Sequence, residues 1–229
     1  MIACADGTAC VVPNQVAIIQ KGQRLFTNSG DASMGYELPA AIGAAFARPG
    51  QRIICIAGDG SIQMNIQELQ TIIHHQLPIK IFVINNSGYL SIKQSQQSFF
   101  NAEYMGSTLD SGVSFPDFTK LADVYGFKSF KLIDKSFIDN IGEIINYPGP
   151  VLCEVLVDTD QVFEPKLSSR VLADGTMQSA SLEDMDPFLD PKELVDNLIS
   201  GENNNISYPK DFKKSKELIR KVQNKSNIK

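Results

Sequence analysis

Two short polar loops, Gly58-Asp59-Gly60-Ser61 and Asn85-Asn86-Ser87-Gly88, hold the residues of this sequence that are best suited to chemistry. Each follows an apolar, β-branched run of the kind that forms a buried strand. Glycines permit a tight turn whose backbone N–H groups can approach a phosphate closely. Asp59 would repel a phosphate, so its expected role is to hold a cation that bridges to one. Magnesium fits, because it binds through one or two carboxylates together with phosphates.

A second oxygen ligand is expected from the neighbouring strand end. Asn86 lies 27 residues after Asp59, a separation that one β-α-β crossover spans. Its side-chain carbonyl and the backbone carbonyl of Gly88 complete three protein ligands for magnesium. Either loop alone is more simply explained as an ordinary turn, and the pairing favours the site. A dinucleotide or nucleoside-triphosphate site is disfavoured, because Gln63 replaces the third glycine of GxGxxG and no P-loop lysine follows.

The elements that must position these loops alternate between strand and helix. The strand patterns are Arg52–Ala57, Ile79–Ile84 and Val151–Val157, and the helical patterns are Met34–Ala47, Asn65–His75, Ser91–Phe99, Phe115–Tyr125 and Ser136–Asn146. Ser114 is the expected N-cap of the fourth helix, and Gly126 is its expected end. This alternation predicts an α/β fold: three layers, with a doubly wound parallel sheet and helices on both faces. In such sheets ligands bind at the carboxyl ends of the strands.

The amino-acid composition disfavours several classes of protein. Hydrophobic residues make up 43% of the 229 residues, enough for a sizeable core, and no apolar run is long enough to span a bilayer. We expect a cytoplasmic protein that binds neither membrane nor nucleic acid, because the net charge is −5 and an excess of basic over acidic residues is found only in a short C-terminal tail. The four cysteines form no CxxC pair, and His74 and His75 are adjacent, so neither zinc nor nucleophilic chemistry is favoured.

One domain is predicted over residues 1–190. Residues 191–229 are predicted to be a C-terminal helix, an Asn-rich linker at 201–206 and a basic tail, within which Lys210–Asn224 has a helical pattern. At the other end, Ile2–Cys4 is shorter than a full central strand, so the chain is expected to begin inside a structural element.

The stretch from Gly58 to Asn86 resembles the thiamine-diphosphate signature, which begins with Gly-Asp-Gly and ends in Asn-Asn. The segments Asn28–Gly43 and Asn65–Leu69 are similar to the pyrophosphate-binding domain of acetolactate-synthase-like enzymes. The likeness covers residues 2 to about 160 and is absent from the tail. It implies thiamine diphosphate and Mg²⁺ as cofactors.

Carried over position by position, the resemblance assigns roles to individual residues. It implies that Asp59, Asn86 and the carbonyl of Gly88 bind magnesium, and that the cofactor contacts are Met34, Gly58, Gly60, Ser61, Asn86 and Tyr89. Met34 falls where the family contacts the aminopyrimidine ring. Asn14 and Gln15 match only loosely a Gln-rich segment that reaches the diphosphate in the family, and Ala17 replaces the usual nearby tryptophan.

The resemblance also implies that half of the active site comes from elsewhere. In this family a glutamate from a pyrimidine-binding domain activates the cofactor, so no catalytic residue is expected in this chain. Glu37 and Glu68 are expected to be helix-surface or capping residues. The chain is expected to form a homo- or hetero-oligomer, such as a dimer, because the Met34 helix and the Tyr89 segment would otherwise expose apolar surface.

The expected reaction is decarboxylation of a 2-oxo acid, with pyruvate favoured, and transfer of the acyl carbanion to an acceptor. Simple decarboxylase, carboligase and C–C hydrolase activities all stay open, as does a non-catalytic cofactor-binding module. The chain is expected to be either one subunit of a split enzyme or a truncated product. Substrate-facing residues are expected within Tyr89–Gln97, and Phe163–Arg170 is a candidate segment for closing over the site.

Overall fold

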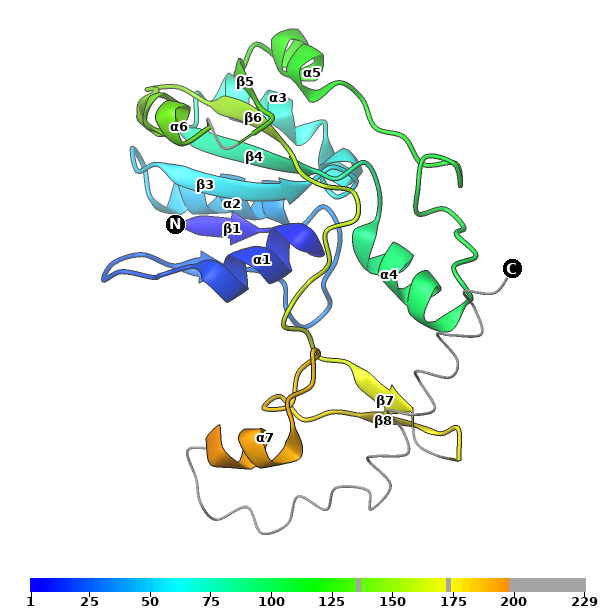
Figure 1. Cartoon of the computed structure of the whole chain (residues 1–229). Helices are drawn as coiled ribbons and strands as arrows, with labels where there is room; N and C mark the ends of the chain where they lie inside the picture. Colours follow the sequence, from blue (N-terminus) through cyan, green and yellow to red (C-terminus); the bar gives the residue numbers. More distant parts are fainter. Residues whose placement is uncertain (135–136, 172–173, 198–229) are drawn as a thin grey trace. The chain divides into compact units, whose positions relative to one another are not determined.

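The computed structural model describes residues 1–134, 137–171 and 174–197 (Figure 1). The chain divides into two compact units, Met1–Val162 and Phe163–Lys229. This division falls earlier than the predicted boundary at residue 190, which stays a prediction. The Asn-rich linker and the basic tail lie outside the described residues.

A six-stranded sheet forms the centre of the first unit, in the order β2-β1-β3-β4-β6-β5 (Figure 1). The strands are β1 (Ile2–Cys4), β2 (Leu25–Phe26), β3 (Ile53–Gly58), β4 (Ile79–Asn85), β5 (Lys128–Leu132) and β6 (Val151–Leu156). Every pair in this sheet is parallel. The predicted α/β fold with a doubly wound parallel sheet is confirmed.

Helices cover both faces of this sheet. They are α1 (Thr8–Val16), α2 (Glu37–Ala47), α3 (Glu68–His74), α4 (Leu90–Phe99), α5 (Phe118–Tyr125) and α6 (Phe137–Asn146), with a 3-10 turn, η1 (Ile62–Asn65), before α3. The main core joins α2, α3 and α5 to β3 and β4 through side chains such as Leu38, Leu69 and Phe118. A smaller cluster packs Ile144 of α6 on β5 and β6.

The strand order brings three strand ends together. Ala3 of β1 and Ile81 of β4 both pair with Cys55 of β3, so the carboxyl ends of these strands lie side by side. After β1 the chain moves outward to β2, and after β3 it moves the opposite way to β4. This reversal between β1 and β3 is a topological switch point, where doubly wound sheets bind their ligands.

Several predicted boundaries change for local reasons. The N-cap of α5 is Asp117 and the prediction of Ser114 was wrong, because Asp117 Oδ1 accepts from the N–H groups of Thr119 (3.0 Å) and Lys120 (3.1 Å). Gly126 ends α5 in the left-handed region at φ 84°, as predicted. The helix predicted at Asn65–His75 divides into η1 and α3. The sequence patterns did not predict α1, β2 and β5.

The second unit contains a small antiparallel hairpin and a short helix. Strands β7 (Ser169–Val171) and β8 (Met177–Ser179) pair, and α7 spans Pro191–Asn197. Closure of Phe163–Arg170 over a site stays a prediction. Across the described parts of both units, no helix combines the length and apolar character needed to cross a membrane. The cytoplasmic location also stays a prediction.

Candidate functional site

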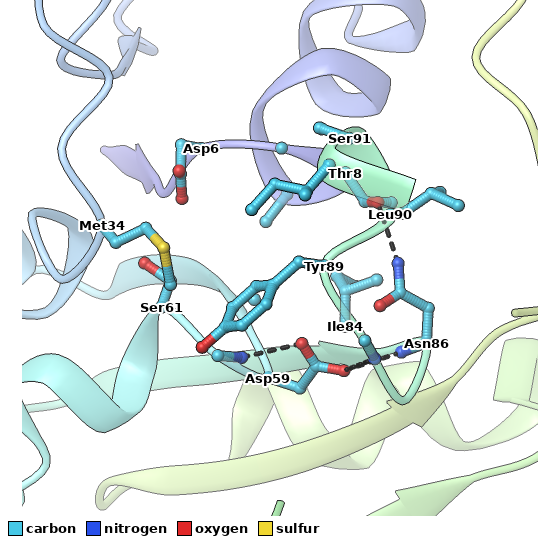
Figure 2. Close-up of a pocket in the computed structure, with 16 residues that line it drawn as sticks. Asp6, Thr8, Met34, Asp59, Ser61, Ile84, Asn86, Tyr89, Leu90 and Ser91 are labelled. Atoms are coloured by element: carbon cyan, nitrogen blue, oxygen red, sulfur yellow. Dashed lines mark hydrogen bonds between the residues drawn. The ribbon is translucent and has the colours of Figure 1, made fainter. Parts of the chain in front are cut away.

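A pocket lies at the carboxyl ends of β1, β3 and β4 (Figure 2). The predicted site residues all line it: Met34, Gly58, Asp59, Gly60, Ser61, Asn86, Gly88 and Tyr89. They come from three separate segments, namely the loop before α2, the turn after β3 and the loop after β4. Residues from the loop after β1 and from the first turn of α4 complete the wall. The structure therefore brings the predicted residues into one place.

Asp59 is the buried carboxyl on the floor of this pocket, with 3% of its surface exposed. Its Oδ1 accepts from the N–H of Gly60 (2.7 Å), and its Oδ2 accepts from those of Asn86 (3.1 Å) and Gly88 (3.3 Å). Burial raises the pKa of Asp59 to about 6 and outweighs these backbone donors, which lower it. A cation beside Asp59 would favour its ionised form.

The side-chain amide of Asn86 has two possible orientations. In one, its nitrogen donates to Asp59 Oδ2 (3.3 Å) and to the carbonyl of Gly88 (2.7 Å), and its oxygen accepts from Thr8 Oγ1 (3.2 Å). In the other, drawn in Figure 2, its nitrogen donates to Thr8 Oγ1 (3.2 Å). Its oxygen then faces only the acceptor oxygens of Asp59 and Gly88. The first orientation satisfies a site without a cation, and the second needs a cation among the three oxygens.

These three oxygens fit magnesium. In an octahedron with metal–oxygen distances of about 2.0–2.1 Å, adjacent ligand oxygens lie about 3 Å apart. The amide position of Asn86 that faces inward lies 2.7 Å from the Gly88 carbonyl and 3.3 Å from Asp59 Oδ2. A carboxylate, an amide oxygen and a backbone carbonyl are also the hard oxygen ligands that magnesium prefers. Both the spacing and the chemistry of the set suit this cation.

The loop after β4 is held in place by close backbone contacts. Ser87 has a left-handed φ of 57°, which is uncommon for a residue with a side chain. A Cβ on Gly88 would lie 2.6 Å from the carbonyl oxygen of Ser107, so only glycine fits there. The N–H of Tyr89 donates to that same oxygen (2.9 Å). The carbonyl of Gly88 thus has a fixed place.

The ring of Tyr89, labelled in Figure 2, lies beside the turn after β3, where it approaches Gly60 closely. A Cβ on Gly60 would lie 2.2 Å from Cε1 of Tyr89. A side chain at this position would have to displace the Tyr89 ring, in addition to disturbing the tight turn expected from the sequence. Phe115 packs edge-on against the same ring, with centroids 6.0 Å apart.

The prediction for Glu37 was wrong, because this residue is neither a helix-surface nor a capping residue. It is fully buried at the start of α2, and Ser61 Oγ donates to its Oε2 (2.9 Å). Burial raises the pKa of Glu37 to about 7. The Ser61 hydroxyl is thereby engaged inside the protein. Glu68 lies outside the pocket, where its carboxylate accepts from Thr71 Oγ1 (2.9 Å).

The sequence analysis missed the loop after β1. Asp6, Gly7, Thr8 and Ala9 line the pocket, whereas Asn14 and Gln15 do not. Asn14 lies further along α1, where its amide donates to the carbonyl of Cys10 (2.9 Å). The missed signal was Asp6-Gly7, which is separated from Ile2–Cys4 by Ala5 alone. The rule that ligands bind at strand ends applies to this short strand as it does to longer ones.

Comparison with known proteins identifies the family to which this chain belongs. Residues 6–155 match the family described as thiamine pyrophosphate enzyme, C-terminal TPP binding domain. The match covers more than half of the chain, and the chain belongs to this family. It confirms the predicted resemblance. At the level of the family, it also supports the predicted cofactors, thiamine diphosphate with Mg²⁺.

Individual relatives are acetolactate synthases. The chain is 41% identical over 149 residues to the acetolactate synthase large subunit of Pyropia yezoensis, a match covering 65% of this chain and 25% of that protein. It is 39% identical over 137 residues to the acetolactate synthase isozyme 2 large subunit of Escherichia coli (strain K12), which covers 59% of this chain and 24% of that protein. The chain thus spans about a quarter of the length of these relatives.

Proposed function

We propose that this chain binds thiamine diphosphate and Mg²⁺ in the pocket at the ends of β1, β3 and β4, as one part of an acetolactate-synthase-like enzyme. The observation that carries the proposal is that the inward amide position of Asn86 lies 2.7 Å from the Gly88 carbonyl and 3.3 Å from Asp59 Oδ2, close to the spacing of adjacent magnesium ligands. Family membership and the acetolactate synthase relatives support it independently.

Different residues of this chain would contact different parts of the cofactor. Asp59, Asn86 and the Gly88 carbonyl would hold the cation that bridges to the diphosphate. Because the Ser61 hydroxyl donates to Glu37 and the Gly60 N–H donates to Asp59 Oδ1, the diphosphate would be met by the backbone N–H groups that follow Gly60. Met34 and Tyr89, from the other walls of the pocket, would contact the remainder of the cofactor.

The proposed reaction is decarboxylation of a 2-oxo acid, with pyruvate as the first candidate, followed by transfer of the acyl group to an acceptor. When bound, thiamine diphosphate supplies the nucleophilic carbon and the stabilised carbanion for this chemistry. The carboxyls that line the pocket are Asp6 and Asp59, and Glu37 is sealed behind Ser61. The activating glutamate would therefore come from a pyrimidine-binding domain.

Apolar side chains support association with such a partner. Ile92 and Phe99 of α4, with Phe100 and Met105 after it, are between 45% and 82% exposed. Large apolar side chains clustered along one segment typically mark an interaction surface. The oligomer is proposed to join this surface to the pyrimidine-binding domain, either in another copy or in a different subunit.

Calorimetric titration of the 229-residue chain with thiamine diphosphate, with and without magnesium, tests the proposal. Wild type is expected to bind in a magnesium-dependent manner, and Asp59→Ala is expected to lose at least about 100-fold in affinity, since a metal ligand is removed. Asp139→Ala, an exposed aspartate on α6, is the matched control. A folded wild type that shows no magnesium-dependent binding would contradict the proposal.

Enzyme activity is a separate question from binding. Acyl transfer from pyruvate is expected only when a pyrimidine-binding domain is present. Magnesium-dependent binding with no turnover in the assembled complex would favour the alternative function, a non-catalytic cofactor-binding module.

A further inference from the structure

We propose that Glu37 is a positioning residue of the cofactor pocket. Acting through Ser61, it fixes the backbone of Gly35 against the turn after β3, and so sets the separation of the two loops that receive the two ends of thiamine diphosphate. This inference rests on the proposed function. It concerns a residue that lies behind the pocket wall and does not touch the cofactor.

The Gly35 peptide is held on both sides by the segment that follows β3. Its N–H donates to Ser61 Oγ (2.8 Å), and its carbonyl accepts from Asn65 Nδ2 (2.7 Å). Gly35 has a left-handed φ of 82°, and a Cβ there would lie 2.7 Å from both Asn65 Nδ2 and Met64 Cβ. The backbone next to Met34 is therefore docked directly on the segment from Ser61 to Asn65.

Glu37 determines which way the Ser61 hydroxyl points. A hydroxyl has one proton, and here it is given to Glu37 Oε2 (2.9 Å), which leaves the oxygen to accept from Gly35. Asp6 is the competing acceptor: burial raises the pKa of its carboxyl, and a hydrogen bond from the Ser61 hydroxyl partly offsets that rise. Without an acceptor at residue 37, the hydroxyl would turn towards Asp6 and its bond to Gly35 would weaken.

The burial of the Glu37 carboxyl lowers the stability of the fold. The side chain is fully buried, and Oε1 has no hydrogen-bond partner among the described residues. A buried carboxyl with one unpaired oxygen is destabilising relative to an apolar side chain of the same shape. The bond from Ser61 links this carboxyl to the pocket, and the backbone of Gly35 also lowers its pKa.

The effect of losing the Glu37–Ser61 bond on binding affinity should depend on the length of the ligand. Thiamine diphosphate would contact both loops, the turn from Gly58 with its diphosphate and Met34 with its ring end. Inorganic pyrophosphate would contact only the turn and the cation. Loss of the link between the loops should therefore weaken binding of the long ligand and spare the short one.

The test compares these two ligands, each with magnesium, by calorimetry on the 229-residue chain. Glu37→Met removes the acceptor at similar volume and is expected to weaken thiamine diphosphate binding at least about tenfold, but pyrophosphate binding less than about threefold. Glu37→Gln keeps an acceptor oxygen for Ser61 and should bind both ligands as wild type does. Glu68→Met, on α3 outside the pocket, is the matched control and should also behave as wild type.

Equal weakening of both ligands in Glu37→Met, or no weakening of either, would overturn the inference. So would a wild type that binds thiamine diphosphate but not pyrophosphate, because the two loops would then not act separately. If Glu37→Met does not fold, Ser61→Ala removes the same link with a smaller change and must show the same contrast. A wild type that binds neither ligand overturns the proposed function, and the inference with it.

Discussion

The buried carboxyls of Asp59 and Glu37 both lie near Ser61 in the turn after β3, and their surroundings differ. Asp59 opens onto the pocket and receives three backbone N–H groups. Glu37 is sealed in the core and receives one hydroxyl. Burial raises both pKa values, that of Asp59 to about 6 and that of Glu37 to about 7.

This difference separates two uses of the same chemical group. Fixed N–H donors and access to a cation favour the ionised form of Asp59 at neutral pH. Glu37 lies away from the proposed cation site, and its burial outweighs the backbone and hydroxyl donors around it, so its pKa is raised further, to about 7. One carboxyl is suited to bind a metal, and the other is suited to hold a neighbouring hydroxyl in place.

The largest expected effect comes from removing each negative charge while keeping the shape. Asp59→Asn should weaken magnesium-dependent binding of thiamine diphosphate at least about 100-fold, because a neutral amide is a poor replacement for a carboxylate ligand. Glu37→Gln should change it less than about threefold, since the acceptor for Ser61 remains. Calorimetry at pH 6.5 measures both. Equal losses in the two variants would remove the distinction between the carboxyls.

The stability of the cofactor-free chain should depend on pH through Glu37. Its pKa is about 7 in the fold against 4.5 for the free group, so the fold binds the proton more tightly than the unfolded chain does. This stabilisation is fully present below about pH 4.5 and is lost as pH rises through about 7. The loss corresponds to roughly 2–4 kcal/mol of unfolding free energy.

Glu37→Gln isolates this contribution, because Asp6 and Asp59 titrate in both proteins. Urea unfolding at pH 5 and pH 8 should show a steeper fall for wild type than for the variant. Parallel curves would mean that Glu37 titrates normally in the fold.

A smaller effect is expected from the backbone on the Glu37 side. Gly35→Ala should lower the free energy of unfolding by roughly 2–3 kcal/mol, because the residue has a left-handed φ and its Cβ would collide with Met64 and Asn65. Gly43→Ala is the matched control within α2, where an added Cβ meets no atom within 4 Å. It should stabilise the helix by about 0.5–1 kcal/mol. Thermal unfolding measures both.

The smallest effect is expected at Thr8, on the Asp59 side. Its hydroxyl can accept from or donate to the Asn86 amide, so it serves the site with and without a cation. Thr8→Val should therefore weaken magnesium-dependent cofactor binding by only about threefold, because much of the loss cancels between the two states. Thr71→Val is the control. A loss above about 30-fold would show that Thr8 acts mainly in the cation-bound state.

The sequence was sufficient to predict the fold class and the residues of the two polar loops. Long apolar runs identify β3, β4 and β6, and the loops that follow them lie where parallel sheets bind ligands. The family resemblance added Met34 and Tyr89, which line the same pocket. Their roles towards the cofactor stay predictions until binding is measured.

The remainder depended on contacts between segments far apart in the sequence. Glu37 was expected at the surface because it is charged, but it lies on the same face of α2 as the buried Ala41 and Ala44, where it contacts Ser61. Thr8 was missed because β1 has three residues, too few for a periodic pattern. Asp117 outcompetes Ser114 as a cap through the backbone path of its loop, which local residue preferences do not determine.

The short strand β1 has a consequence for the order of folding. Ile2 and Cys4 pair with Ile54 and Ile56, so their contact closes a loop of about 50 residues. Asp6 to Ala9 can reach the pocket only after this closure. Such non-local pairing is intrinsically slow, and during synthesis β1 must wait for β3 before the two strands can pair. The binding pocket is therefore a late product of folding, and a cofactor that binds it would stabilise only the finished sheet.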